Sequence, residues 1–360
     1  MFNILPSQIV KNFCLKIYIQ KGKASLHSPI MTKPRPSDVF FFSCPRTLSN
    51  LLVKLLSQQQ GWEGSGYYFH SACMYAVENF SYSVDAEAPP EKRQEFVRQL
   101  REGFAKMEAA RDKAHRNGNA LFLKNHCAQI WKPSSLYEAT KNGQFAAEFT
   151  LDDDDDAPPL AHTNPTMLPD PYLVSFVPIF LIRHPALMVD SWFRASTSAG
   201  HPPDPCLTTR ARSHGLGLAR ELYDWYAARL LTTATSDESR SRSPPPTPGC
   251  KGVPIVVDAD DVLEGDTVPR LTAVIGMDPA QVLRGWEAQS TEGMVPLDKS
   301  YMQGICDSTG IDTSKSARRL DIEAMYRSWR ETYGDEVAEY MVKVTESDLP
   351  NYEYMKSKKM

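Results

Sequence analysis

The chain has 360 residues, of which 42% are hydrophobic and 10% aromatic, and its 40 Lys and Arg side chains nearly balance 44 Asp and Glu. The apolar content excludes a fully disordered chain, and the absence of a repeat excludes a fibre. A formal charge of −4 argues against a nucleic-acid binder, which normally carries excess basic charge. We therefore expect a globular protein of one large or two ordinary domains.

The cysteines and the apolar runs restrict the environment of the protein. Seven cysteines are scattered along the chain without a C-x-x-C pair, which argues against a disulfide framework and against a zinc site. This usage predicts a reducing, cytoplasmic location. No apolar run approaches the roughly 18 residues that span a bilayer, so we expect no membrane segment.

A single folded domain is predicted for residues 38–349, with polar insertions near residues 152–165 and 236–251. The first insertion contains five consecutive aspartates, which do not resemble a calcium loop, and the second is rich in Ser, Arg and Pro. Residues 1–37 carry six basic and no acidic side chains and are expected to form a disordered leader. A transit-type presequence fits this Lys-rich segment less well. Residues 350–360 are expected to form a C-terminal tail.

Short apolar runs alternate with segments of helical periodicity along this domain. The four predicted strands are Val39–Ser43, Ala120–Leu123, Phe176–Ile182 and Val253–Val257. Helical spacing is found at Leu48–Leu56, Phe96–Met107, Pro185–Ala195 and Leu218–Leu230, and Pro185 occupies the favoured first position of its helix. Alternating buried strands and helices predict an α/β fold with three α/β/α layers around a central parallel sheet.

Three of the four predicted strands end in cationic or imidazole side chains. Arg46 follows the first strand, and Arg183 follows the third. Lys124 and His126 follow the second. Taken singly, these residues fit a surface charge, an ion-pair partner or a core histidine. Because the carboxyl ends of parallel strands meet at one edge of a sheet, their coincidence instead favours an anionic ligand with several phosphate-type groups.

The loop after the first strand has donors that suit a phosphate. Arg46, Thr47, Leu48, Ser49 and Asn50 lead into a helix whose first N–H groups lack intrahelical partners. The two hydroxyls also fit plain N-capping. The loop has neither the Gly nor the Lys of G-x-x-x-x-G-K-[ST], and no G-x-G-x-x-G opens a helix, so neither a nucleoside-triphosphate hydrolase nor a nicotinamide site is indicated.

A second anion subsite is expected after the third strand. Ser191 follows Arg183 by eight residues, which places it about two turns into the next helix. The guanidinium and the hydroxyl are therefore expected to reach one phosphate from different sides.

These motifs resemble those of the sulfotransferase superfamily, over roughly residues 38–345. Cys44-Pro-Arg-Thr-Leu-Ser-Asn-Leu51 resembles the 5′-phosphosulfate loop of that family. Arg183 and Ser191 resemble its 3′-phosphate motif, and Lys124-Asn-His126 is similar to its Lys-Thr-His element. The chain looks most similar to divergent sulfotransferase-like proteins of fungi.

The resemblance implies a P-loop NTPase-like fold and metal-free transfer of a sulfuryl group. The donor would be 3′-phosphoadenosine-5′-phosphosulfate (PAPS), the product 3′-phosphoadenosine-5′-phosphate (PAP), and the acceptor a small hydroxylated compound such as a secondary metabolite. His126 would be the general base, while Lys124 and Arg46 would stabilise charge. The residues implied to bind the nucleotide are Arg46, Thr47, Leu48, Ser49, Asn50, Arg183 and Ser191.

Two features depart from the family pattern. Leu48 stands where the family has Gly, so a phosphate cradle requires helical dihedrals at this residue. The Gly-rich adenine-side motif is missing, and Ser308–Gly310 and Lys315 are the candidates to replace it.

An aromatic stretch after the first helix is the candidate acceptor pocket, because aromatic walls suit a planar or apolar molecule. The residues in it that we expect to bind the acceptor are Tyr67, Tyr68, Phe69, His70 and Tyr75. Core packing explains each of them equally well. We expect a small-molecule partner, no nucleic acid and no membrane, while the acceptor and the oligomeric state stay open.

Two other functions stay open from sequence alone. A protein that keeps this fold could have changed chemistry, as a hydrolase, lyase, cyclase or nucleotide-binding non-transferase. The Ser/Arg/Pro-rich stretch could instead serve a non-enzymatic interaction module.

Overall fold

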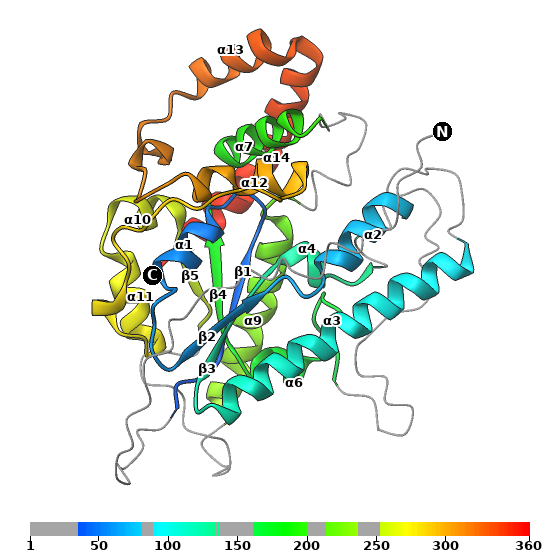
Figure 1. Ribbon diagram of the computed structural model, residues 1–360, viewed down its shortest axis with the longest axis vertical. Helices are drawn as coiled ribbons and strands as arrows, with labels where there is room; N and C mark the ends of the chain where they lie inside the picture. Colours follow the sequence, from blue (N-terminus) through cyan, green and yellow to red (C-terminus); the bar gives the residue numbers. More distant parts are fainter. Residues whose placement is uncertain (1–34, 81–88, 134–135, 137–160, 201–213, 237–252) are drawn as a thin grey trace.

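Five parallel strands form the centre of the protein, in the order β2-β3-β1-β4-β5 (Figure 1). They are β1 (Val39–Ser43), β2 (Trp62–Gly66), β3 (Ala120–His126), β4 (Val177–Ile182) and β5 (Ile255–Asp258). The computed structural model describes residues 35–80, 89–133, 136, 161–200, 214–236 and 253–360. The leader up to residue 34 and most of both polar insertions therefore lie outside the described residues.

The sequence predicts four of these strands, and the fifth, β2, is a strand that hydropathy does not reveal. Its sequence, Trp-Glu-Gly-Ser-Gly, has no apolar run. Its last residue, Gly66, pairs with Lys124 of β3, and a Cβ at this position would lie 2.5 Å from the Lys124 carbonyl oxygen. Glycine is thus required where β2 approaches β3 closely. The β3 strand is longer than predicted, because Lys124 and His126 belong to it.

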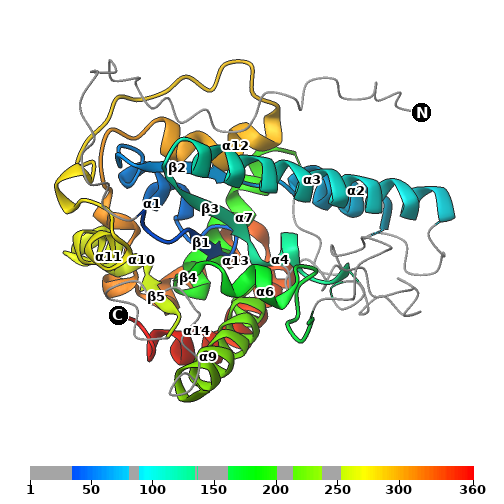
Figure 2. The same ribbon diagram turned by 90° about the horizontal axis from the view of Figure 1, so that it is seen from below.

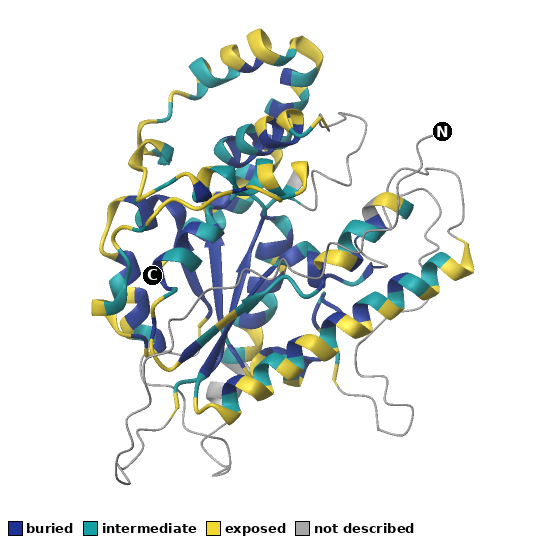
Figure 3. Cartoon of the chain, viewed as in Figure 1, coloured by how far each residue is buried: buried dark blue, intermediate teal, exposed yellow. Residues whose placement is uncertain are grey.

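Alternate residues of each strand bury against different helices, which gives the three layers. The helices around one core cluster are α2 (His70–Phe80), α3 (Pro90–Arg116), α4 (Cys127–Ile130), α6 (Asp170–Val174) and α9 (Gly217–Ser236). The helices around the other are α1 (Ser49–Leu55), α10 (Ala259–Glu264) and α11 (Thr267–Ile275). Phe40 and Phe42 of β1 face the first cluster, and Val39 and Phe41 face the second. Figure 3 shows the largely buried strands β1, β3, β4 and β5 between the partly exposed helices, and the edge strand β2 as partly exposed. The predicted three-layer α/β/α fold is confirmed.

A further group of helices lies at the carboxyl ends of the strands, above β4 in Figure 1. It consists of α7 (Pro185–Ser198), α12 (Pro296–Cys306), α13 (Ile322–Tyr333) and α14 (Asp335–Lys356). Trp192 and Phe193 of α7 pack with Trp329 of α13 and Met341 of α14 in a third buried cluster. Among the helices that the structure describes, none has the length and apolar character needed to cross a membrane.

The structure corrects our expectation of a C-terminal tail at residues 350–360. The long helix α14 continues to Lys356, and Tyr352 and Met355 on it are fully buried in the first core cluster. The Tyr352 hydroxyl donates a hydrogen bond of 2.9 Å to the Asp258 carboxylate at the end of β5. Figure 2 shows this end of α14 beside α9. The segment is therefore part of the domain core, a role that its polar sequence does not indicate.

Asp38, just before β1, is a buried ionic centre at the end of the sheet away from the strand exits. Its carboxylate accepts hydrogen bonds from Arg35 (2.9 Å), Arg111 (2.8 Å) and His115 (2.8 Å). It also accepts one from the backbone N–H of Leu121 (2.9 Å). Burial would raise the pKa of Asp38, but these donors hold it below its ordinary value.

We expect Asp38→Asn to lower the free energy of unfolding by about 3 kcal/mol, because two cations lose their buried counter-charge. In the wild type this contribution is complete above the ordinary carboxylate pKa and is lost as the pH falls through the depressed pKa. Urea unfolding at several pH values measures both effects. Asp112→Asn, at an exposed position of the same helix α3 that carries Arg111, is the control. Equal stability of the two variants would contradict the prediction.

Candidate active site

The loop between β1 and α1 adopts a backbone conformation that normally requires glycine. Arg46 has φ of 68° and Leu48 has φ of 64°, both in the left-handed region. The Leu48 carbonyl accepts hydrogen bonds from the N–H groups of Leu51 and Leu52, so Leu48 caps the start of α1. Leu48 therefore has left-handed, not right-handed, helical dihedrals. Leucine therefore holds a backbone conformation here that glycine adopts at no steric cost.

We expect Leu48→Gly to be much less destabilising than the same change in a right-handed helix. A left-handed non-glycine residue costs roughly 1–2 kcal/mol, which glycine releases. Leu187 of α7 is similarly half-buried but lies in a regular helix, where glycine costs about 1 kcal/mol. The free energy of unfolding in urea should thus favour Leu48→Gly over Leu187→Gly by about 2 kcal/mol. A larger loss at Leu48 would show that its side-chain packing outweighs the backbone strain.

Arg46 connects the loop to α7 and α12. Its Nε donates a hydrogen bond of 2.9 Å to the Ser191 hydroxyl, and its Nη1 donates one of 3.1 Å to the Tyr301 carbonyl. Its guanidinium lies 5.1 Å from the centre of the Tyr301 ring. The first loop and Ser191, which the sequence assigned to two separate subsites, are therefore in direct contact.

Arg183 extends from the end of β4 beneath the same loop and is buried. Its two terminal nitrogens donate to the carbonyls of Arg46 (2.9 Å) and Lys315 (3.1 Å). Its Nε is buried without a hydrogen-bond partner. Burial and the nearby Arg46 charge lower the pKa of Arg183 to about 10. In the described part of the chain, neither guanidinium forms a salt bridge with a carboxylate. Two guanidiniums without a salt-bridged carboxylate, one of them with an unused donor, have the chemistry that suits an anion.

Lys124 brings a third cation to this edge from β3. Its side chain is buried, its ammonium donates to the Asn50 amide oxygen, and its Nζ lies 4.5 Å from the centre of the Tyr67 ring. Burial lowers the pKa of Lys124 to about 7. A negatively charged group bound beside Lys124 would raise this pKa again and keep the lysine protonated.

His126 follows two residues later, on the same face of β3. Its Nδ1 lies 2.9 Å from the Ser43 hydroxyl, and its Nε2 lies 3.2 Å from the Tyr67 hydroxyl. Burial and the Lys124 charge hold the pKa of His126 well below its ordinary value. The imidazole is thus neutral at physiological pH, which is the form that a general base requires.

Two curated proteins are similar to the chain over most of its length. Sulfotransferase ppzF of Metarhizium majus is 28% identical over 357 residues, which cover 91% of this chain and 97% of that protein. Sulfotransferase ppzF of Metarhizium rileyi is 27% identical over 355 residues with the same coverage. The chain is thus similar to two fungal proteins named as sulfotransferases over about nine-tenths of its length. No family model and no solved structure matches it.

The predicted aromatic stretch divides between the site and the core. Tyr67 lies against Lys124 and His126, and the centre of the His70 ring is 6.5 Å from that of Tyr67. The prediction that Phe69 contacts the acceptor is wrong, because Phe69 is fully buried in the core cluster under α3. Tyr68 and Tyr75 pack against that cluster, as the core-packing alternative expects.

Sequence reasoning missed several residues of the site. Ser43 holds His126, and its only sequence signal is its place at the end of a predicted strand. Tyr301 and Met302 of α12 contact Arg46 and Asn50, the latter through a 3.1 Å hydrogen bond from the amide to the Met302 sulfur. Nothing in the sequence indicates that a helix some 250 residues away covers the first loop. Lys315, a weak candidate for the adenine side, reaches the site through its carbonyl, which accepts from Arg183.

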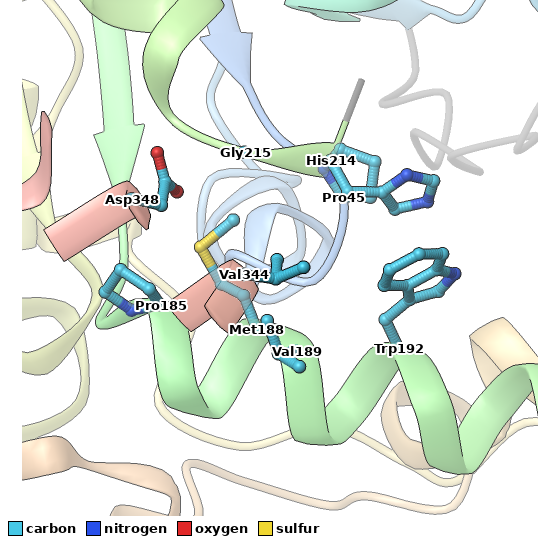
Figure 4. A pocket seen from close by; sticks show the side chains of 9 residues that line it. All are labelled: Pro45, Pro185, Met188, Val189, Trp192, His214, Gly215, Val344 and Asp348. Carbon is cyan, nitrogen blue, oxygen red and sulfur yellow. The ribbon is translucent and has the colours of Figure 1, made fainter. Parts of the chain in front are cut away.

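A small pocket lies behind the first loop, between α7 and α14 (Figure 4). Its lining is mainly apolar and comprises Pro45, Pro185, Met188, Val189, Trp192, His214, Gly215, Val344 and Asp348. The rings of Trp192 and His214 are stacked with centres 4.3 Å apart. At the far end of the pocket, the two carboxylate oxygens of Asp348 accept hydrogen bonds of 3.0 and 2.8 Å from the Leu216 N–H. Pro45, in the loop that carries Arg46, forms part of the pocket wall.

Proposed function

We propose that the protein transfers the sulfuryl group of PAPS to a hydroxyl of a small acceptor. The observation that carries this proposal is the convergence of Arg46, Lys124 and Arg183 beside the neutral His126. Three cations without carboxylate partners match a ligand with several phosphate and sulfate groups. A neutral imidazole next to them matches the removal of a proton from an alcohol or phenol.

The residues present fit the nucleotide donor. The unpartnered Nε of Arg183 is a buried donor that a phosphate oxygen would satisfy. The first loop offers its backbone N–H groups, Arg46 and the hydroxyl of Ser49, while Ser191 contacts Arg46 from the other side. PAPS would supply the activated sulfuryl group. Arg46, Thr47, Leu48, Ser49, Asn50, Arg183 and Ser191 would hold it.

The protein's own groups then have distinct roles. Lys124 and Arg46 stabilise the negative charge that develops on the transferring group and on the leaving phosphate oxygen, which is usually the dominant contribution in such reactions. His126 takes up the proton of the acceptor hydroxyl. Ser43 orients the imidazole through Nδ1, and α12 closes the site over the loop.

Two measurements test the proposal. PAP at 1 mM is expected to raise the melting temperature, because a ligand that binds only the folded state stabilises it by mass action. Transfer of radiolabelled sulfate from PAPS to a panel of phenols and alcohols then tests the reaction itself. Absence of any shift with PAP would refute the nucleotide site. A shift without transfer to any acceptor would favour a nucleotide-binding protein with changed chemistry.

A further inference from the structure

Tyr67 lies where the loop between β1 and α1, the proposed base His126 and the lysine Lys124 meet. Tyr67 directly follows β2, and its φ of 61° is left-handed, a strained conformation for a bulky residue. Its backbone N–H donates 3.1 Å to the Lys124 carbonyl, and its carbonyl accepts 3.1 Å from the His70 N–H. Among the described residues, the three non-glycine positions with positive φ are Arg46, Leu48 and Tyr67, all at this site. Strain of this kind concentrates at functional sites.

The Tyr67 hydroxyl lies within hydrogen-bonding distance of His126. Nδ1 of His126 faces the Ser43 hydroxyl at 2.9 Å, and Nε2 faces the Tyr67 hydroxyl at 3.2 Å. A neutral imidazole carries one proton, so one of its nitrogens donates and the other accepts. A relay through Tyr67 requires the Nδ1–H tautomer, in which Nε2 has the free lone pair and the Tyr67 hydroxyl donates to it.

We propose that Tyr67 is a catalytic residue that relays the acceptor's proton to His126. This proposal rests on the proposed sulfuryl transfer. When the acceptor oxygen forms its bond to sulfur, its O–H bond breaks and the proton passes to the Tyr67 oxygen. At the same time the proton of Tyr67 passes to Nε2 of His126, so Tyr67 ends as a neutral phenol. The bond from sulfur to the donor's phosphate oxygen breaks with its electron pair, and the imidazolium later releases its proton to water.

The surroundings of the tyrosine suit a relay better than a base. Burial raises the pKa of the Tyr67 hydroxyl well above its ordinary value, so it does not form a stable phenolate. Lys124 lies over the face of the ring, where its charge stabilises negative charge that develops transiently on the oxygen. The alternative is that Tyr67 only fills the place of the acceptor hydroxyl and moves away when an acceptor binds. The two interpretations predict opposite effects of removing the hydroxyl.

Release of PAP from PAPS with water as acceptor tests the relay without knowledge of the natural acceptor. Tyr67→Phe is expected to slow this release at least about tenfold, while the PAP-induced rise in melting temperature is retained. His126→Ala should be at least as slow, and the double variant no slower than His126→Ala, because both groups act on one proton. Unchanged or faster release by Tyr67→Phe would overturn the relay. Tyr354→Phe, which removes a hydroxyl bonded to Asp224 on α9, is the matched control.

Nitrogen NMR of the full chain labelled at histidine separates this proposal from the proposed function. In the wild type, His126 is expected as the Nδ1–H tautomer with a hydrogen-bonded Nε2. Tyr67→Phe should move the Nε2 resonance toward that of a nitrogen without a donor, and Tyr354→Phe should not. An unchanged Nε2 resonance in Tyr67→Phe would refute the relay, whatever the activity. Absence of a PAP shift in the wild type would instead refute the nucleotide site and leave the NMR result intact.

Discussion

Arg183→Met is expected to weaken PAP binding by about 100-fold or more. The variant keeps an unbranched apolar side chain but removes the buried guanidinium, whose Nε has no hydrogen-bond partner among the described residues. Hydrogen bonds between a charged donor and a phosphate contribute about 1.5–3 kcal/mol each, and about 2.7 kcal/mol corresponds to 100-fold. Titration calorimetry with PAP measures the loss directly. The rise in melting temperature at 1 mM PAP should shrink with it, because the stabilisation falls with the logarithm of the affinity.

The control for Arg183 is Arg194→Met. Arg194 lies on α7 nearby, but it is exposed and pairs with Asp190. Its removal is expected to change PAP affinity less than threefold, since exposed charges are screened by solvent. The melting temperature without ligand shows whether Arg183→Met is folded. A folded Arg183→Met that binds PAP as tightly as the wild type would place the nucleotide elsewhere.

Lys124→Met should have opposite effects on stability and on activity. Burial lowers the pKa of Lys124 to about 7. Holding this lysine away from water therefore lowers the free energy of unfolding of the ligand-free protein. Methionine fits the same volume without that penalty, so we expect a gain of at least about 1 kcal/mol in the free energy of unfolding at pH 7. Sulfuryl transfer should fall about 100- to 1000-fold, because a cation at the developing charge is lost.

The pH dependence of this stability gain is a sharper test than its size. The unfolded chain holds the Lys124 proton up to about its ordinary pKa of 10.5, whereas the folded chain releases it near 7. Between these values the unfolded state binds more protons, so wild-type stability rises with pH through this residue. The advantage of Lys124→Met is therefore largest below pH 7 and vanishes toward pH 10.5. Lys113→Met, at an exposed position of α3, should show no such trend. A loss of stability in Lys124→Met would contradict the prediction.

The strand exits show how far sequence alone leads. The strands β1, β3 and β4 can be recognised in the sequence as apolar runs, because both faces of a central strand are buried. Since parallel strands end at one edge, the positions of Arg46, Lys124, His126 and Arg183 in the sequence already bring them together. The prediction of an anionic ligand also follows from these positions, because all of these side chains are cationic or basic.

Other features depend on contacts between distant segments. The β2 strand is formed because Gly66 allows close approach to β3, and no hydropathy pattern reveals this. The role of Tyr67 follows from that approach, since its hydroxyl reaches His126 only when β2 pairs with β3. Phe69, two residues later, points into the core instead. Spacing in an aromatic stretch cannot distinguish these two outcomes.

The sequence by itself therefore determined the layered α/β fold and the edge of the sheet at which the cationic and imidazole side chains meet. These depend on hydrophobic periodicity and on the direction of parallel strands, which are local properties. Only the tertiary structure decided the left-handed conformation of Leu48, the contact between Arg46 and Ser191, and the position of α12 over the loop. These features depend on packing between segments far apart in the chain, and packing is specified by the shapes of many side chains together.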